Sequence, residues 1–510
     1  MSDRPSPDAA NPLLESHARL REAERLRLAK ALDEAQAICA ELVKAHPNYV
    51  GALGTLGLIY AERRDYEGAW LNLSRAAMLN PRDWKILTAL AGVYFKLGAS
   101  EMAMRTLEQA RSLKPEDASI LVSLAEIYRA EREQELAAAA SEQAHALDAS
   151  SRATRIGLGR NLARLGRLDA AAAVFNSLAG DGPEDLSVLF GLSQLPPGLA
   201  SVDVLKSLGN LRARPGQPPD EFAIEVAFAR AAALDRAKRH PEAWRELVDV
   251  NARIFAPLAE AAHKEEQSRI MHLELLRGFA TLNYPVSTKQ PACQSLFILG
   301  PPRSGKTTTE RLAALLPGVR RGYENPIVEN AIRRTFQGAG FITRSQLAEL
   351  PSQLDQVFCQ TYLAELAERA KGALVFTNTR PGRIIDACRM ASVLPGVRFI
   401  FVKRDAYDLA LRIYMKRYQS SQNPFSYDLK ALFRYIAWYN AMMDVIAGQF
   451  PGIVRILAYE DIVADPKRAL ATIAEFCGLP LPDTAISPLT DDRGAAAPYR
   501  KVMEKALNAG

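Results

Sequence analysis

Cysteine and histidine are scarce in this chain of 510 residues. The five cysteines are scattered, odd in number and form no Cys-x-x-Cys pair, and the six histidines do not cluster. These absences argue against a disulfide framework and against a structural or catalytic zinc site, so no metal is expected. They are also typical of a protein kept in a reducing compartment.

Long apolar runs are missing as well. No stretch approaches the roughly 18 apolar residues that a membrane-spanning helix needs. The beginning of the chain, MSDRPSPDAANPLLE, lacks the apolar core of a signal peptide. We therefore expect a cytoplasmic protein that does not span a membrane, with residues 1–12 as a disordered lead-in.

Neither sign of charge is in large excess. The chain has 64 lysines and arginines against 58 aspartates and glutamates, which gives a net charge of +6. This mild excess is compatible with an anionic ligand but does not indicate a nucleic-acid-binding surface. With 48% hydrophobic and 24% charged residues, the composition is that of a folded soluble protein of several units.

What the first half does have is an internal repeat. Pro47, Pro81 and Pro115 are spaced 34 residues apart. Other positions recur in the same register, and the best preserved are Leu56-Gly57, Leu90-Ala91, Leu124-Ala125 and Leu158-Gly159. Small residues let paired antiparallel helices approach closely, and the proline ends the second helix of each pair. The pattern resembles the tetratricopeptide repeat, and the alternative is a generic helical bundle rich in alanine and leucine.

The helical pattern continues beyond the regular repeats. The register weakens after about residue 180, and the proline- and glycine-rich segment 195–222 is predicted to be an irregular connector. The spacing then predicts one more helix pair over 225–251 and a further helix over 256–282. We therefore expect an all-α solenoid over residues 13–285.

The second half changes to short apolar runs that alternate with helical stretches. Strands are predicted at 295–300, 373–377, 397–402 and 453–459, and a helix is expected after each of the first three. Strands alternating with helices favour a parallel sheet covered on both faces. We assign residues 286–510 to this α/β domain.

The first of these strands leads into FILGPPRSGKTT, a tight turn followed by a helix. Backbone N–H groups at such a helix N-terminus, together with the side chains of the loop, form a site for a phosphate or sulfate. The loop spells G-x-x-x-x-G-K-T, which matches a Walker A nucleotide loop. It also resembles the PRSGTT loop of sulfotransferases, so the loop alone leaves both families open.

The rest of the domain favours the second family. The strand VRFIFV ends in Lys403-Arg404-Asp405 and not in the aspartate that a Walker fold needs for Mg²⁺. This ending is similar to the RDP-x-D segment of sulfotransferases, and AYEDIVADPKRALATIAEFCGLPLP (458–482) is similar to their YEDLV-x-DP…GLP segment. The resemblance runs along 295–485 and implies an α/β P-loop-like sulfotransferase domain. Tetratricopeptide repeats in front of it fit bacterial sulfotransferases that resemble the tyrosylprotein enzymes.

The resemblance implies a role for each candidate site residue. The co-substrate would be 3′-phosphoadenosine 5′-phosphosulfate, with its 5′ side on the loop and its 3′-phosphate on an arginine. The implied catalytic residues are Arg303, Lys306 and Glu324. The implied nucleotide-binding residues are Arg303, Ser304, Gly305, Lys306, Thr307, Thr308, Arg404 and Arg412.

Several positions depart from the family pattern. Tyr323 stands where the carboxylate after Gly322 is usual, so the proton acceptor would be Glu324, with Glu329 as a less favoured substitute. Thr379 replaces a lysine, and Arg412 replaces the serine that joins the arginine at the 3′-phosphate. The end of the chain also shows no recognisable copy of the segment that closes over the nucleotide.

Two other functions therefore stay open. One is a P-loop nucleotide hydrolase or kinase, and the other is a non-catalytic repeat scaffold with a vestigial transferase domain. In the favoured interpretation, the concave face of the solenoid binds a protein or peptide and recruits the acceptor. The acceptor could be a protein tyrosine, a polysaccharide or a lipid headgroup, because acceptor contacts lie on loops with no readable code.

Overall fold

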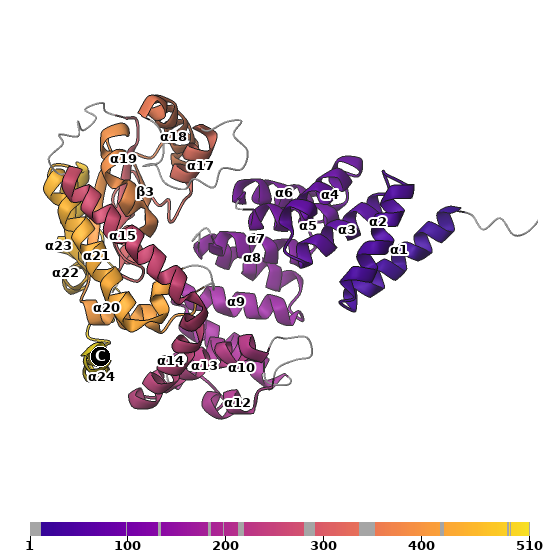
Figure 1. Ribbon diagram of the computed structural model, residues 1–510, viewed down its shortest axis with the longest axis horizontal. Coiled ribbons are helices and arrows are strands. Elements are labelled where there is room, and N and C mark those ends of the chain that lie inside the picture. The colour runs from indigo at the N-terminus through magenta and orange to yellow at the C-terminus, as the bar shows by residue number, and fades with distance from the viewer. Residues whose placement is uncertain are drawn as a thin grey trace, which may run out of the picture. The chain divides into compact units, whose positions relative to one another are not determined.

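The computed structural model divides the chain into two compact units, Met1–Pro183 and Glu184–Gly510 (Figure 1). The predicted lead-in, residues 1–12, lies outside the described residues except for Pro12, at which the first helix begins. The structure describes residues 12–97, 99–130, 134–181, 185–196, 198–212, 219–279, 291–335, 352–418, 423–486, 489 and 491–508.

The described part of the first unit is built of helical hairpins. Successive helices pack in pairs, α1 with α2, α3 with α4 and so on to α9 with α10, and short turns make the partners antiparallel. The helices are α1 (Pro12–Leu28), α2 (Leu32–Ala45), α3 (Val50–Glu62), α4 (Tyr66–Leu79), α5 (Trp84–Lys96), α6 (Ser100–Leu113), α7 (Ala118–Ala130), α8 (Gln134–Leu147), α9 (Arg152–Arg164) and α10 (Leu168–Gly180). This confirms the predicted repeat array.

The recurring small residues lie where the two helices of a hairpin touch. A Cβ atom added to Gly57 would lie 2.5 Å from Cγ of Leu73 on the partner helix. One added to Gly159 would lie 2.8 Å from the ring of Phe175. Pro47 and Pro81 each follow the end of a second helix by two residues. The period read from the sequence is therefore the period of close helix contact.

The second unit begins with helices α11 (Leu186–Ser193), α12 (Val204–Asn210), α13 (Pro219–Arg236), α14 (His240–Phe255) and α15 (Ala259–Phe279). The expected helix pair and the helix after it are present as α13, α14 and α15. The prediction of an irregular connector over 195–222 was wrong in part, because α12 forms within it. Asp203 stabilises α12 by accepting a hydrogen bond from the backbone N–H of Lys206.

These helices pack on the α/β part of the chain. Asn251 donates a hydrogen bond to the carbonyl of Tyr414 at 3.0 Å, and the rings of Trp244 and Tyr414 are 5.6 Å apart. Both rings belong to the core cluster that also contains strand residues of the sheet. The boundary near residue 285 stays a prediction, but the helices before it lie in the same compact unit as the sheet.

The sheet has five parallel strands in the order β2-β3-β1-β4-β5. All four predicted strands are present, as β1 (Gln294–Leu299), β3 (Val375–Asn378), β4 (Arg398–Lys403) and β5 (Val454–Ala458). The edge strand β2 (Val319–Arg320) was not predicted, because two residues make no apolar run. The predicted α/β class with a parallel sheet is confirmed.

Helices cover both faces of the sheet. Leu296 and Ile298 of β1 pack with residues of α16 (Lys306–Ala313), α22 (Tyr459–Ala464) and α23 (Pro466–Cys477). Phe297 and Leu299 point to the other face, as alternate residues of a strand must. That face is covered by α17 (Ile327–Thr335), α18 (Asp355–Ala370), α19 (Ala387–Val393), α20 (Ala406–Tyr414), α21 (Leu429–Gln449) and α24 (Arg500–Asn508), together with the helices before the sheet.

Within the described ranges, we find no helix with the length and apolar content required to cross a bilayer.

Candidate active site

The candidate site lies at the carboxyl ends of β1 and β4. These strands are parallel neighbours in register, with Leu299 opposite Phe401. The chain leaves β1 into the loop 300–305 and leaves β4 at Arg404. From β1 the sheet continues to β3 on one side and to β4 on the other. Ligands of open α/β sheets bind in the crevice at such a point.

The loop has the backbone shape of an anion site. Arg303 and Gly305 both have positive φ angles, 68° and 104°, and Gly305 is the N-cap of α16. No side chain caps this helix, and the N–H groups at the start of a helix are a favourable site for an anion. The Ser304 hydroxyl is buried and has no hydrogen-bond partner within the described residues. A strained loop with an unsatisfied donor suits a ligand that supplies acceptors.

Lys306 does not point freely from the loop. The residue is only 6% exposed, and its Nζ donates a hydrogen bond to the carbonyl of Pro301 at 2.9 Å. Thr307 is exposed and Thr308 is half-buried. Arg303 keeps exposed surface, while crowding by protein atoms and the nearby guanidinium groups of Arg412 and Arg404 lower its pKa.

Tyr459 joins this loop to the end of β4. A Cβ atom at Gly305 would lie 2.4 Å from the Tyr459 ring, so only glycine fits there. The guanidinium carbon of Arg404 lies 4.3 Å from the centre of the same ring. Tyr459 begins the YED segment, and the next residue, Glu460, accepts a hydrogen bond from the backbone N–H of Asp405. The aromatic ring therefore packs against both the anion loop and Arg404.

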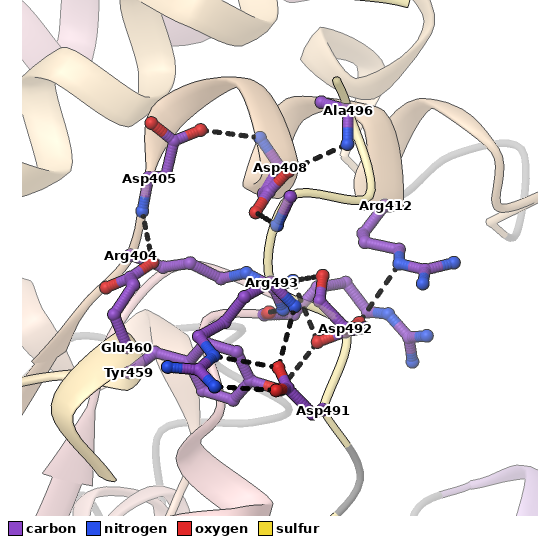
Figure 2. A network of polar contacts seen from close by, with 12 residues as sticks. Arg404, Asp405, Asp408, Arg412, Tyr459, Glu460, Asp491, Asp492, Arg493 and Ala496 are labelled. Atoms are coloured by element: carbon purple, nitrogen blue, oxygen red, sulfur yellow. Dashed lines mark hydrogen bonds and ion pairs between the residues drawn. The ribbon is translucent and has the colours of Figure 1, made fainter. Parts of the chain in front are cut away.

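Arg404 and Arg412 meet on one carboxylate, that of Asp492 (Figure 2). Arg404 donates to Oδ1 at 2.9 Å and to the backbone carbonyl of Asp492 at 3.1 Å, and Arg412 donates to Oδ2 at 3.0 Å. Arg404 also donates to the carbonyl of Arg303 at 3.1 Å, and its side chain is only 3% exposed. The two arginines, eight residues apart, thus form one anion-binding pair beside the loop.

Asp492 belongs to a short segment that we call the C-terminal strap, residues 491–496. Asp408 accepts a hydrogen bond from the backbone N–H of Ala496 at 2.8 Å (Figure 2). It accepts a second one from the backbone N–H of Gly494 at 2.6 Å. The strap therefore folds back onto α20. Sequence reasoning recognised no closing segment here, because Asp492 meets its two arginines only through the fold and gives no local signal.

The Asp492 carboxylate is held in its charged form. Burial alone would raise its pKa, but the Tyr459 hydroxyl and the guanidinium groups of Arg404 and Arg412 lower it. Burial and the hydrogen bond to Asp492 raise the pKa of Tyr459 to about 12. The Tyr459 hydroxyl is therefore a donor to this carboxylate at neutral pH.

The turn that carries Glu324 is fixed by a residue that sequence reasoning missed. Glu310 of α16 is buried and accepts hydrogen bonds from the backbone N–H of Tyr323 and from the Thr377 hydroxyl. The same hydroxyl accepts from the N–H of Gly322 at 2.9 Å. The pKa of Glu310 is raised, because the effect of burial exceeds the opposing effect of nearby Arg321. The half-buried Glu324 follows directly on this turn.

Glu329, the less favoured proton acceptor, is already paired with arginines. Glu329 lies 2.7 Å from Nε of Arg380 and 3.5 Å from a terminal nitrogen of Arg383. Thr379, which stands where the family has lysine, is buried and donates its backbone N–H to Tyr323.

The aspartate nearest to the end of β4 has a local structural role. The Asp405 side chain accepts hydrogen bonds from the N–H groups of Tyr407 and Asp408 and caps α20. The strand β3 ends in Asn378. In the described part of the chain, no three His, Cys, Asp or Glu side chains gather in a group that could hold a metal ion.

Comparison with known proteins identifies the class of this domain. Residues 295–483 match the model of the Sulfotransferase family. "Protein-tyrosine sulfotransferase 2" of Gallus gallus is 23% identical over 213 residues, which cover 40% of this chain and 56% of that protein. A protein of Aquifex aeolicus (strain VF5), named "Uncharacterized protein", is 22% identical over 356 residues, 68% of this chain and 46% of its own length. The chain spans about half the length of these curated relatives.

Solved structures of tetratricopeptide-repeat proteins show a low similarity to this chain. A thermophilic tetratricopeptide-repeat protein of Thermus thermophilus is 23% identical, with 34% of this chain and 94% of that chain covered and a TM-score of 0.31. A tetratricopeptide-repeat protein of Parabacteroides merdae ATCC 43184 is 16% identical, with 46% and 92% covered and a TM-score of 0.36. The repeat assignment depends on the period and helix pairing of this chain itself. The chain thus joins tetratricopeptide-type hairpins to a sulfotransferase family domain.

The Asp492 contacts predict a pH-dependent stability. Asp492→Asn should lower the free energy of unfolding at pH 7 by about 1.5–3 kcal/mol, because hydrogen bonds to a charged group are lost. The folded-state pKa of Asp492 is lowered from 3.8, so its stabilisation is present above that pH and is lost as the pH falls through the folded pKa. Calorimetry of both proteins from pH 7 downward should show the difference shrinking below pH 3.8.

Asp491→Asn is the matched control. Asp491 is exposed and pairs with Arg493 at 2.7 Å, so its removal should change stability little. An equal loss in the two variants, or a difference that does not change with acidification, would contradict the prediction.

Proposed function

We propose that the protein transfers a sulfuryl group from 3′-phosphoadenosine 5′-phosphosulfate to a hydroxyl of a macromolecular acceptor. The observation that most supports this donor is the pairing of Arg404 and Arg412 on a single carboxylate, beside a strained anion loop. Two guanidinium groups suit the charge and the acceptor oxygens of a 3′-phosphate, and they lie beside the loop proposed for the 5′ groups. The Sulfotransferase family match over 295–483 supports the reaction class.

The reaction is an in-line displacement at sulfur. The bond from sulfur to the bridging oxygen of the 5′-phosphate breaks as the acceptor oxygen bonds to sulfur. Negative charge develops on the leaving phosphate oxygen, where Arg303 and the N–H groups at the start of α16 would stabilise it. Lys306 would also stabilise this charge once its Nζ donates to an oxygen of the bound co-substrate and no longer to the Pro301 carbonyl. Glu324 would take the proton of the acceptor hydroxyl.

The loop residues have distinct parts in this proposal. Gly305 lets the backbone approach the 5′ groups, because no side chain fits between its Cα and Tyr459. Ser304 would gain the hydrogen-bond partner that it lacks among the described residues. Thr307 and Thr308 would add hydroxyl donors at the first turn of α16. Phosphate binding and transfer of the sulfuryl group then depend on different atoms of one short segment.

Nucleotide binding tests the donor assignment. Arg412→Gln should weaken the binding of 3′-phosphoadenosine 5′-phosphate by about ten- to a hundredfold, since a charge-assisted hydrogen bond is removed. The affinity for adenosine 5′-phosphate, which lacks the 3′-phosphate, should fall by less than twofold. Isothermal titration calorimetry of Arg404→Gln, Arg412→Gln and the control Arg493→Gln measures both affinities.

The same titration separates the alternatives. Arg493 pairs with exposed Asp491, so its substitution should leave both affinities unchanged. Equal weakening of both nucleotides in Arg412→Gln would refute the 3′-phosphate assignment. Tight binding of ATP with Mg²⁺ would favour a nucleotide hydrolase or kinase, and binding of neither nucleotide would favour a scaffold with a vestigial domain.

An acceptor-independent assay tests Glu324. In the reverse direction, an aryl sulfate gives its sulfuryl group to 3′-phosphoadenosine 5′-phosphate and releases a phenol. Glu324→Gln should slow phenyl sulfate, a poor leaving group that needs a proton, by about 10²–10⁴-fold. It should slow 4-nitrophenyl sulfate far less, because that leaving group departs as a stable anion.

Glu329→Gln is the comparison variant, since Glu329 is paired with Arg380. It should slow both aryl sulfates by the same factor, whatever that factor is. If Glu324→Gln also slowed both substrates equally, proton transfer by Glu324 would be ruled out.

The solenoid is proposed to bring a macromolecular acceptor to the transferase. From the sequence, we expected the concave face of the solenoid to bind the partner. The first unit contains a mainly apolar groove of about 530 Å³ that could serve as such a surface. The groove lies where the ends of α6 and α8 approach each other, and Leu147 lines it. Recruitment of this kind raises the local acceptor concentration without changing the chemical step. A protein acceptor would fit the similarity to a protein-tyrosine sulfotransferase.

Two substitutions on one helix test recruitment in the full-length chain. Leu147 and Leu136 of α8 are 46% and 49% exposed, but only Leu147 is among the groove residues. Leu147→Glu should reduce transfer of ³⁵S-sulfate to lysate macromolecules by about tenfold or more, the scale of a buried interface side chain, whereas Leu136→Glu should not. Turnover of 4-nitrophenyl sulfate should not change in either variant. Normal macromolecular labelling by Leu147→Glu would exclude the groove as the recruiting surface.

A further inference from the structure

The arginine pair is occupied by the chain's own carboxylate. Asp492 accepts hydrogen bonds from Arg404, Arg412 and Tyr459, and its backbone carbonyl takes a further bond from Arg404 (Figure 2). We propose that Asp492 is an internal competitor of the donor, so that the C-terminal strap must release the arginine pair before a 3′-phosphate can bind. This inference rests on the proposed function, which assigns the 3′-phosphate to the same two arginines.

The carboxylate and a phosphate cannot share the pair as it is arranged. The terminal nitrogen of Arg404 nearest to the strap already serves both a carboxylate oxygen and the carbonyl of Asp492, and its other terminal nitrogen serves the carbonyl of Arg303. The Nε of Arg404 is buried without a hydrogen-bond partner among the described residues. A second anion next to Asp492 would meet a like charge in a largely buried site. Binding of one anion therefore requires departure of the other.

Exchange favours the phosphate once it is present. A carboxylate has one negative charge and two acceptor oxygens, whereas a phosphate monoester has between about one and a half and two charges and three acceptor oxygens. The larger charge of the phosphate matches two guanidinium groups better than the single charge of a carboxylate does. Asp492 thus satisfies the buried Arg404 in the empty protein and gives way to a stronger ligand.

The strap is built so that Asp492 can leave while its neighbours stay. Asp408 holds the strap downstream, through the N–H groups of Gly494 and Ala496. Gly494 has a positive φ of 70° and open space around its Cα, so the chain turns at the first of these two anchor residues, two positions after Asp492. On the other side of Asp492, Asp491 contacts Arg493 of the strap itself. A swing of residues 491–493 about Gly494 would free the arginines while the N–H of Ala496 stays bonded to Asp408.

Calorimetric titration with 3′-phosphoadenosine 5′-phosphate tests the competition. If Asp492 occupies the pair at least nine-tenths of the time, the apparent affinity of the wild-type protein is lowered about tenfold or more. Asp492→Asn keeps the shape of the side chain and removes its charge, so it should bind this nucleotide about tenfold tighter. Asp491→Asn removes one negative charge from the same strap and should bind it like the wild type. Adenosine 5′-phosphate should bind all three proteins alike.

The pattern differs from that of a purely structural residue. Asp492→Asn should melt at a lower temperature and yet bind the nucleotide more tightly. A latch with no competing role would lower the melting temperature and leave the affinity equal or weaker. If wild type and Asp492→Asn bind 3′-phosphoadenosine 5′-phosphate equally, the inference is wrong and the proposed donor stands.

Two further measurements complement the titration: the first does not need the nucleotide, and the second does not need the variant. Inorganic sulfate, at matched ionic strength, should stabilise Asp492→Asn more than wild type, and equal stabilisation overturns the inference even if the donor assignment fails. In the wild-type protein, adding the nucleotide should speed amide hydrogen exchange at residues 491–493. Slower exchange there on binding would show that the strap closes over the ligand and does not give way to it.

Discussion

A single buried charge sets the arrangement of the candidate site. The guanidinium of Arg404 is almost fully removed from water at the end of a central strand, and a buried charge is tolerated only with close partners. Its partners come from segments far apart in the sequence: the carbonyl of Arg303, the ring of Tyr459 and the carboxylate of Asp492. The anion loop, the YED segment and the strap are thus held together because each of them meets one part of this side chain.

The same requirement explains why the site is at once stable and ready to bind. The empty protein must supply an anion to Arg404, and it does so with a residue that has no other evident role in the transfer chemistry. The loop beside it keeps strain, with Arg303 in a left-handed conformation, and a buried hydroxyl at Ser304 without a partner among the described residues. Such features persist where the surrounding structure fixes them and a ligand can relieve them. Stability and function compete for the same few atoms.

The sequence was informative wherever a feature is local. The repeat period, the strands, the anion loop and the position of Arg404 at a strand end all follow from runs of neighbouring residues. Asp492 and Glu310 could not be predicted, because each acts on residues about 10 to 90 positions away and has no motif of its own. The helix α12 was missed because its cap, Asp203, lies among prolines and glycines that suggest irregular structure. Side-chain pairing across the fold requires coordinates, whereas periodicity and turn chemistry do not.

Residues that follow the sheet in the sequence contribute to the core of the second unit. Tyr499 is buried, packs against Trp244 and donates its hydroxyl to Asp235, while Met503 of α24 is buried as well. Domains fold during synthesis from the N-terminal side as the chain emerges. The repeat hairpins can therefore fold one after another while the ribosome is still at work. The second unit cannot complete its core until Tyr499 and Met503 have been synthesised, so during synthesis finished hairpins are attached to a sheet that still lacks part of its packing.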